Sequence, residues 1–267
     1  MTYNPKKPIH YQLKTKKALT LITLIICSGP ASAQVPISNQ NPITIDFSDF
    51  NGSGFSTTPI TGQLDSNTWR ITGLSDGDGA FGGTHTAGDF ARGSDVEGGI
   101  STGGVYAFDI SGNIAIGIQP GGSDATPGTL TLRLTNNTGS TLHGFNVSYD
   151  VFVNNDQGRA NSFNFAYSAN DTSYTNVQAG SVTSIEASDT NGFVNAGTLS
   201  FAISGINLDN GENFYFQWKA GDVSGSGARD EFALDNIRFN AVVPEPGTYA
   251  LLSGICSLSF IILRRRK

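Results

Sequence analysis

The stretch Thr129-Leu-Thr-Leu-Arg-Leu-Thr135 alternates polar and apolar side chains at every position. Successive side chains of a β-strand point to opposite faces, so the three leucines, at positions 130, 132 and 134, would share one face. A helix would distribute the same leucines around its axis. The stretch therefore predicts a strand with one buried face and one exposed face.

Nine further segments show the same two-residue period. Ten strands joined by turns rich in Gly, Asn and Asp predict an all-β fold, two packed antiparallel sheets forming a β-sandwich of jelly-roll or concanavalin-like topology. A composition of 33 Gly and 14% charged residues suits strands and turns, and no segment of the domain has a convincing helical period. The nine segments are 43–47, 68–72, 105–109, 114–118, 142–153, 162–167, 198–204, 214–219 and 232–239.

The segment 73–104 is rich in glycine, yet Phe81, Phe90, Val96 and Ile100 recur along it. This spacing predicts a long ordered loop packed on one edge of the sandwich, and such loops are common binding sites.

Two carboxylates, Asp76 and Asp78, stand on a glycine turn in this loop, and hard oxygen ligands at such spacing suit calcium. The turn is not an EF-hand loop, because Ala80 and Gly88 occupy positions that need acidic ligands. Asp89, Asp95 or Glu97 would have to complete the site; a solvated acidic turn is the alternative.

The net charge of the domain limits the kinds of molecule that it can bind. Between residues 34 and 243, seven Lys and Arg side chains stand against 21 carboxylates, a formal charge of −14, whereas the whole chain is only −6. A domain this acidic repels phosphate backbones, which argues against nucleic-acid binding. Cations and neutral polysaccharides remain compatible partners.

The N-terminal segment has the three parts of a secretory signal peptide. Lysines up to Lys17 precede the apolar run 18–27, and Ala31-Ser32-Ala33 then supplies small residues before Gln34. About ten apolar residues are too few to span a bilayer that needs roughly 20. We therefore predict that residues 1–33 are removed by signal peptidase and that residues 34–243 form the exported domain.

Cys27 and Cys256 are the only cysteines, and both lie in the apolar terminal segments. The exported domain therefore has no disulfide, no cysteine-based zinc site and no cysteine nucleophile. Ile26 precedes Cys27 where lipid-linked cleavage needs a small residue, which argues against a lipoprotein.

A second basic and apolar segment follows the domain. Val243-Pro-Glu-Pro-Gly247 leads into the apolar stretch 248–263 and then Arg264-Arg265-Arg266-Lys267. The prolines end the sheet structure, and 16 residues would make a helix of about 24 Å against a hydrocarbon core of roughly 30 Å. The basic end would stay cytoplasmic, leaving the domain on the far side of the membrane. Residues 244–267 are thus predicted to be a tail with a transmembrane helix over 248–263.

This tail resembles the tails of PEP-CTERM proteins, in which a Pro-Glu-Pro signature, here Pro244, Glu245 and Pro246, precedes a short apolar helix and a basic end. The resemblance implies recognition by exosortase, a membrane-embedded cysteine transpeptidase that would cut near this signature and free the domain from the inner membrane. It also implies a Gram-negative host that makes exopolysaccharide, and a place on the cell surface or in the biofilm matrix. An ordinary single-span anchor is the alternative. The resemblance says nothing about residues 34–243.

The end of the domain resembles the closing hairpin of jelly-roll adhesion and carbohydrate-binding domains, which often finish in a strand of the type Ala-Leu-Asp-Asn-Ile, here 233–237. Asp235 and Asn236 are expected to tie neighbouring loops together; alternatively, Asp222, Asp230 and Asp235 share a calcium ion. Strict alternation would place Phe232, Leu234 and Asn236 on one face, and Ala233, Asp235 and Ile237 on the other.

Aromatic and amide side chains offer candidate sugar contacts. Trp69 and Trp218 could form a stacking platform, although each alternates with apolar neighbours and is better suited to the core. Asn155 and Asp156 lie in a polar turn whose side chains could reach a glycan; an ordinary strand connection explains the same residues.

The candidate catalytic side chains of the domain match no known catalytic motif. His85 and His143 lie outside any nucleophile motif, and the acidic strand 230–235 departs from the Glu-x-Asp-x-x-Glu pattern of laminarinase-like sandwiches. We therefore expect a non-enzymatic surface or matrix protein that adheres to or organises exopolysaccharide. One alternative is a calcium-stabilised structural module without a sugar ligand. The other is a secreted glycoside hydrolase that uses two carboxylates among Glu97, Glu186, Glu212 and Glu231.

Overall fold

A computed structural model describes Met1, residues 35–95 and residues 98–243 of the protein. All strands lie in the compact unit that begins at Ser32. The described part contains 16 strands and two short 3-10 helices, in the order β1 (Val35–Ile37), β2 (Ile43–Ile45), β3 (Phe50–Ser56), β4 (Gly62–Asp65), β5 (Trp69–Thr72), η1 (Gly88–Phe90), β6 (Ser94–Asp95), β7 (Gly104–Ile110), β8 (Asn113–Gln119), β9 (Gly128–Asn136), β10 (Leu142–Asn154), β11 (Arg159–Ser168), β12 (Thr175–Asn176), η2 (Gln178–Gly180), β13 (Val182–Thr183), β14 (Phe193–Leu208), β15 (Asn213–Gly225) and β16 (Glu231–Val242).

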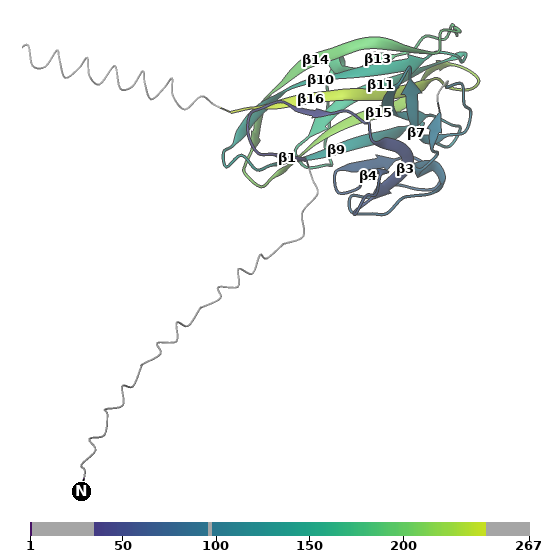
Figure 1. Ribbon diagram of the computed structural model, residues 1–267. Helices are drawn as coiled ribbons and strands as arrows, with labels where there is room; N and C mark the ends of the chain where they lie inside the picture. The colour runs from purple at the N-terminus through teal and green to yellow at the C-terminus, as the bar shows by residue number, and fades with distance from the viewer. Residues whose placement is uncertain (2–34, 96–97, 244–267) are drawn as a thin grey trace, which may run out of the picture. The chain divides into compact units, whose positions relative to one another are not determined.

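Two seven-stranded sheets form the body (Figure 1). Sheet A has the order β1-β9-β15-β11-β12, with β5 beside β9 and β13 beside β11. Sheet B has the order β14-β10-β16-β8-β7-β6, with β2 beside β16, while β3 and β4 make a separate pair. The two sheets share one buried cluster of apolar side chains, so the predicted all-β sandwich is confirmed.

Each of the ten predicted strands is present, but the sheets are not purely antiparallel. β1 pairs with β9, β3 with β4 and β6 with β7 in parallel. In each pair, one strand has at most four residues. A strand this short shows no measurable two-residue period, which explains why the sequence pattern did not predict these pairings.

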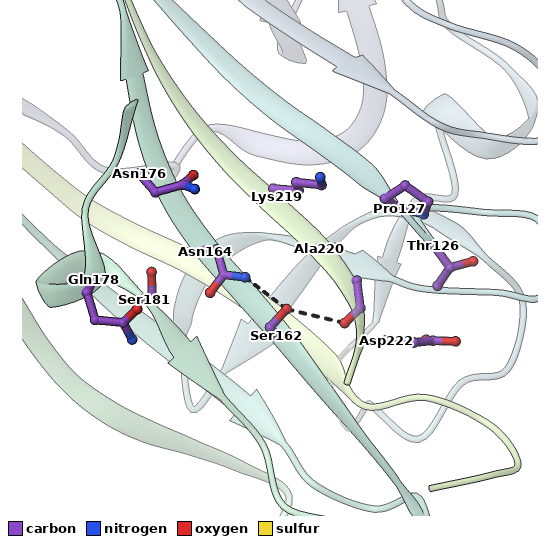
Figure 2. Close-up of a pocket in the computed structure, with 11 residues that line it drawn as sticks. Thr126, Pro127, Ser162, Asn164, Asn176, Gln178, Ser181, Lys219, Ala220 and Asp222 are labelled. Atoms are coloured by element: carbon purple, nitrogen blue, oxygen red, sulfur yellow. Dashed lines mark hydrogen bonds between the residues drawn. The ribbon is translucent and has the colours of Figure 1, made fainter. Parts of the chain in front are cut away.

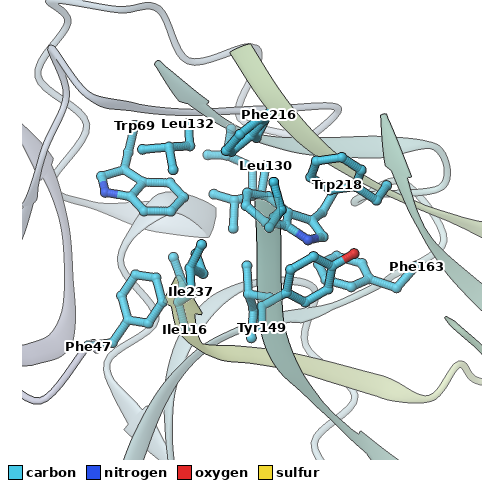
Figure 3. Packing of buried hydrophobic residues seen from close by; sticks show 14 of the residues in the cluster. Phe47, Trp69, Ile116, Leu130, Leu132, Tyr149, Phe163, Phe216, Trp218 and Ile237 are labelled. Carbon is cyan, nitrogen blue, oxygen red and sulfur yellow. The ribbon is translucent and has the colours of Figure 1, made fainter. Parts of the chain in front are cut away.

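Aromatic side chains from both sheets hold the sandwich together (Figure 3). Trp218 of β15 is fully buried, and its ring centroid lies 5.4 Å from that of Tyr149 on β10 in a T-shaped contact. Phe145 of β10 lies 5.0 Å from Phe214 of β15. Edge-to-face and offset contacts of this kind add to the burial of a large apolar area, so these rings fix the two sheets against each other.

One extra residue in β16 changes which side chains face the core. Ser148 pairs with Arg238, but Asp150 pairs with Asp235, so β16 bulges between these positions. Asn236 has a φ of 50° in this bulge. The bulge resets the alternation, and Ile237 is fully buried in the core cluster. The strict alternation expected from the sequence, with Ile237 facing away from Phe232 and Leu234, is therefore wrong at this point.

The described part of the glycine-rich segment 73–104 is packed, as predicted, but not along one edge. Phe90 is buried in the core cluster, whereas the ring of Phe81 lies 6.0 Å from that of Tyr215 on the outer face of sheet A. Ser94–Asp95 then joins the edge of sheet B as β6. The segment therefore connects the two sheets.

Replacing Trp218 by Ala removes the ring that contacts β5, β10 and β11. We expect a loss of about 3–5 kcal/mol in the free energy of unfolding, measured by denaturant titration, because a large buried aromatic leaves a cavity. Val223→Ala is the matched control on the same strand, since Val223 is 55% exposed; its effect should stay within about 0.5 kcal/mol. Equal effects of the two substitutions would contradict this packing.

Candidate functional site

The outer face of sheet A carries a continuous polar surface. Phe163, Phe165 and Trp218 face the core, so the alternate residues on β11 and β15 point away from it. The strand register aligns these residues in rows: Lys219 pairs with Asn164 on one side and with Thr129 of β9 on the other. Alternation thus turns the strands of a hydrophobic core into a polar outer surface.

A groove of about 540 Å³ lies on this face. Figure 2 shows Asn164 and Ser162 on β11 beside Lys219 on β15, with Gln178 and Ser181 on one side and Thr126 and Pro127 on the other. The groove is therefore floored by two strands and bordered by two connecting segments. Its lining residues are Thr126, Pro127, Ser162, Asn164, Asn176, Gln178, Ser181, Lys219, Ala220, Gly221 and Asp222.

The lining groups are mostly neutral amides and hydroxyls. Asn164 Nδ2 donates to Ser162 Oγ at 3.0 Å, and Ser162 Oγ donates to the Gly221 carbonyl at 3.4 Å. Within the described residues, the side chains of Asn176, Gln178 and Lys219 make no hydrogen bond to another group, and all three are exposed. The groove therefore presents free donors and acceptors to a ligand.

Aromatic and charged side chains cover another part of the same face. Phe81 lies between the guanidinium groups of Arg70 and Arg133, at 4.6 and 4.4 Å from its ring centroid. Arg70 makes a bidentate ion pair with Asp171, both distances being 2.7 Å. Tyr174 donates to Asp171 at 2.6 Å. These contacts satisfy one another, and none of these residues lines the groove.

Among the described residues, Asp222 is the one carboxylate in the groove lining, and two arginines pair with it. Arg229 contacts both carboxylate oxygens at 2.7 Å, and Arg159 contacts one at 2.8 Å. The hydrogen bonds and charge of Arg229, followed by those of Arg159 and Asn161, hold the pKa of Asp222 below its usual value against a smaller opposing effect of burial. Asp222 therefore stays ionised and is unsuited to donate a proton.

The structure places Asp76 and Asp78 in loop-closing roles. Asp76 Oδ2 accepts the backbone N–H of Asp89 at 2.9 Å, and Asp78 Oδ1 accepts that of Gly73 at 2.7 Å. Asp89 is itself paired with Arg92. Asp95 accepts the N–H of Gly98 at 2.7 Å, while Glu97 lies outside the described residues.

The three carboxylates predicted to share calcium at the closing hairpin are Asp222, Asp230 and Asp235, and their hydrogen bonds go to different partners. Asn161 donates to Asp222 at 3.0 Å and accepts the backbone N–H of Asp230 at 3.2 Å. Asp235 instead accepts from Asn113 at 3.0 Å. In residues 35–95 and 98–243, no three His, Cys, Asp or Glu side chains gather as a metal site would. The structure does not bring Asp222, Asp230 and Asp235 together around one ion.

The predicted sugar-contact residues are divided between core and strand ends. Trp69 and Trp218 are 4% and 0% exposed, with ring centroids 6.4 Å apart, so neither offers a face to a sugar, and the stacking platform is wrong. Both occupy inward positions of their strands, which explains the burial. Asn155 is buried and donates to the Ala187 carbonyl at 2.8 Å, while Asp156 is half-buried.

The carboxylates considered for hydrolysis lie in different surroundings. Glu186 is exposed in the loop after β13, and Glu212 accepts the backbone N–H of Asp209 at 2.8 Å in the turn before β15. Glu231 is fully buried at the start of β16. None of these three lines the groove.

The remaining predicted residues lie outside the described part of the chain. They are Ala31, Ala33 and Gln34 at the expected signal cleavage site, and Pro244, Glu245, Pro246, Arg264, Arg265 and Arg266 in the tail, together with the helix expected over 248–263. Among the described residues, no helix has the length and apolar character needed to cross a membrane.

Sequence reasoning missed the groove residues Asn164, Gln178 and Lys219. A signal was present for two of them, since the alternation of 162–167 and 214–219 already assigns Asn164 and Lys219 to outward faces. Gln178 comes from η2, a three-residue turn with no pattern that would place it beside β11. Only the folded chain shows the two segments side by side.

No protein-family model and no curated protein matches this chain. Several solved carbohydrate-binding modules resemble its fold. A CBM28 module specific for non-crystalline cellulose has 17% identity and a TM-score of 0.35, covering 54% of this chain and 86% of that one. A CBM4 structure has 15% identity and a TM-score of 0.34, covering 77% and 97%. The CBM22-1 xylan-binding domain from Paenibacillus barcinonensis has 13% identity and a TM-score of 0.32, covering 56% and 92%.

The buried carboxyl groups of β16 predict a pH dependence of stability. Burial first, and then the charge of Asp156, raises the pKa of Glu231 to about 8. Burial, with neighbouring carboxylates, also raises the pKa values of Asp230 and Asp235. Above the pKa of an ordinary carboxyl group, the unfolded chain has released these protons, while the folded protein still holds them. With a chelator present to remove metal ions, the melting temperature should therefore fall as pH rises from about 5 to 8.

Glu231→Gln is the control for this pH dependence, because glutamine does not titrate. The slope of melting temperature against pH should be smaller in this variant than in the wild type. An identical slope in both proteins, or a wild-type melting temperature that rises over this range, would contradict the assignment.

Proposed function

We propose that this chain is an exported, non-catalytic protein that binds extracellular polysaccharide through the groove on the outer face of sheet A. The observation that carries the proposal is the lining of this groove: neutral amides and hydroxyls, with one lysine and one charge-matched carboxylate. Such groups form hydrogen bonds with sugar hydroxyls in either direction, since amides and hydroxyls both donate and accept.

The charge distribution favours neutral or weakly acidic glycans. Lys219 is the single lysine of residues 34–243, and it projects from the groove of a domain whose formal charge is −14. Strongly anionic polymers would be repelled by the domain as a whole. Because no aromatic ring among the described residues lines the groove, binding would depend on hydrogen bonds along the polymer.

The groove chemistry also supports a non-catalytic role. Glycoside hydrolysis needs two carboxyl groups on opposite sides of the scissile bond, one of them with a raised pKa. Among the described residues, Asp222 is the one carboxylate that lines the groove, and Arg229 holds its pKa low. A bound polysaccharide would therefore be retained and not cut.

Export and sorting complete the proposal, on the grounds of the terminal sequences. Signal peptidase would remove residues 1–33, and an exosortase would recognise Pro244, Glu245 and Pro246 before the apolar stretch and the basic end. The domain would then reach the cell surface or the extracellular matrix, where exopolysaccharide is the abundant ligand.

Retention on immobilised exopolysaccharides, with release of reducing ends measured in parallel, tests the binding role. Asn164→Ala and Gln178→Ala should each weaken binding about 2- to 10-fold, since one net hydrogen bond is worth roughly 0.5–1.5 kcal/mol. Asn207→Ala is the matched control, because Asn207 is an exposed amide on β14 of the other sheet. Release of sugars would contradict the non-catalytic role, and equal losses in the three variants would exclude the groove.

Substitution of the Pro-Glu-Pro signature tests the sorting role. With Pro244 and Pro246 both changed to Ala, the protein should stay in the membrane fraction at its unprocessed mass, whereas the wild type is released. Pro59→Ala is the control, since Pro59 is exposed and far from the tail in sequence. Release of the double variant at the wild-type mass would argue for a different mode of anchoring or processing.

A further inference from the structure

The outer face of sheet B ends in a buried row of polar side chains. Glu231 begins β16 and pairs with Asn154 of β10. On its other side, β16 pairs with β8, and Phe232 lies opposite Ile118. Gln119, the next residue of β8, therefore lies opposite Glu231. Residues opposite each other in an antiparallel pair point to the same face. Glu231, Asn154 and Gln119 therefore share one face at one end of the sheet.

This end of the face is covered and not open to solvent. Tyr106, Phe108 and Ala233 form a small apolar cluster beside the row, with Ile100 packed against it. The exposed fractions of Glu231 and Gln119 are 0% and 1%. The segment from Gly98 onward thus lies over the polar row and separates it from water.

The close approach of this segment depends on glycine. Gly98 and Gly99 have φ angles of 72° and 71°. A Cβ atom on Gly98 would lie 2.5 Å from Asn154 Nδ2, and one on Gly99 would lie 3.4 Å from Asp156 Oδ2. Ile100 follows and donates its backbone N–H to Glu231 Oε1 at 2.8 Å. The backbone at 98–100 is therefore in contact with both carboxylates.

Three buried oxygens around this segment have no hydrogen-bond partner among the described residues: Glu231 Oε2, Gln119 Oε1 and Asp156 Oδ1. The orientation of Gln119 is fixed, because its Nε2 donates to the carbonyls of Pro120 at 2.9 Å and Arg229 at 3.1 Å. Its oxygen is consequently left as an acceptor. Unpaired buried acceptors are rare in native proteins and call for an unseen donor or cation.

No positive side chain meets this need in the described part of the chain. Arg92 pairs with Asp89, and both Arg159 and Arg229 pair with Asp222. The nearby Asp230 faces the other side of the strand, where Ser184 Oγ and the Gln157 N–H donate to it. The carboxylates of Glu231 and Asp156 thus remain close together without a paired positive side chain among the described residues.

We propose that Glu231, Asp156 and Gln119 bind one divalent cation of the oxygen-seeking class, Ca²⁺, beneath the Gly98–Ile100 segment. Carboxylate and amide oxygens are the ligands that Ca²⁺ takes, and water with backbone carbonyls would complete its six to eight oxygens. Among the described residues the site holds two acidic side chains, and no group of three or more His, Cys, Asp or Glu side chains gathers there. It shares no ligand with the calcium sites that the sequence predicted.

The test is a Ca²⁺ titration of the purified, chelator-treated protein, read by thermal unfolding in the absence of any glycan. At a hundredfold excess over the dissociation constant, Ca²⁺ should raise the melting temperature by about 5–10 °C. Tb³⁺, which takes the same oxygen ligands, should luminesce on tyrosine excitation, because Tyr106 lies on the same face, and Ca²⁺ should quench this signal by competition.

Glu231→Gln and Asp156→Asn should each abolish the calcium-dependent rise and the Tb³⁺ signal. Glu231→Gln removes a buried charge, so in chelator its melting temperature at pH 8 should equal or exceed that of the wild type, which separates lost binding from failed folding. Glu186→Gln is the matched control, since Glu186 is exposed. No rise in the wild type, or an undiminished rise in Glu231→Gln, would overturn the proposal.

Discussion

The contact between the aromatic inner faces of the two sheets is the constraint on which the rest of the structure depends. Trp218, Phe214 and Phe165 of sheet A pack against Tyr149 and Phe145 of sheet B at ring separations of 5.0 to 5.8 Å. Once these side chains face inward, the pleat of each strand fixes which residues face outward. The groove residues Asn164 and Lys219 alternate with core residues on the same strands. Core packing therefore positions the candidate site.

A sequence with a clear two-residue period revealed the class of fold and the long strands, but not the local departures from that period. The bulge at Asn236 changes the facing of Ile237, and no pattern of residue types marks it. Trp69 and Trp218 suited both a sugar platform and a core, and only their placement between the sheets decides for the core. Long regular strands were predictable because every residue along them adds to the same alternating pattern. Bulges and short strand pairings have no such pattern and were not predictable.

The candidate site was less predictable than the fold, because it combines distant segments. Gln178 and Asn164 line the same groove only because η2 lies alongside β11 in the folded chain. Asp222 is unsuited to act as a metal ligand or an acid only because Arg159 and Arg229 pair with it. The sequence singled out acidic residues by type and spacing. Their roles depend on counter-charges and burial, which follow from the tertiary arrangement. Glu231, one of the carboxylates considered for hydrolysis, is instead buried beneath a glycine segment.

Lys219 allows a direct test of the proposal that the outer face of sheet A receives a polysaccharide. It is exposed in the groove and is the single lysine of residues 34–243, so amine acylation of this domain reports on one side chain. Acylation is measured by mass spectrometry with and without a bound exopolysaccharide, against an added lysine peptide as reference. We expect Lys219 to react more slowly in the complex. Unchanged reactivity while the glycan remains bound would contradict binding at this face.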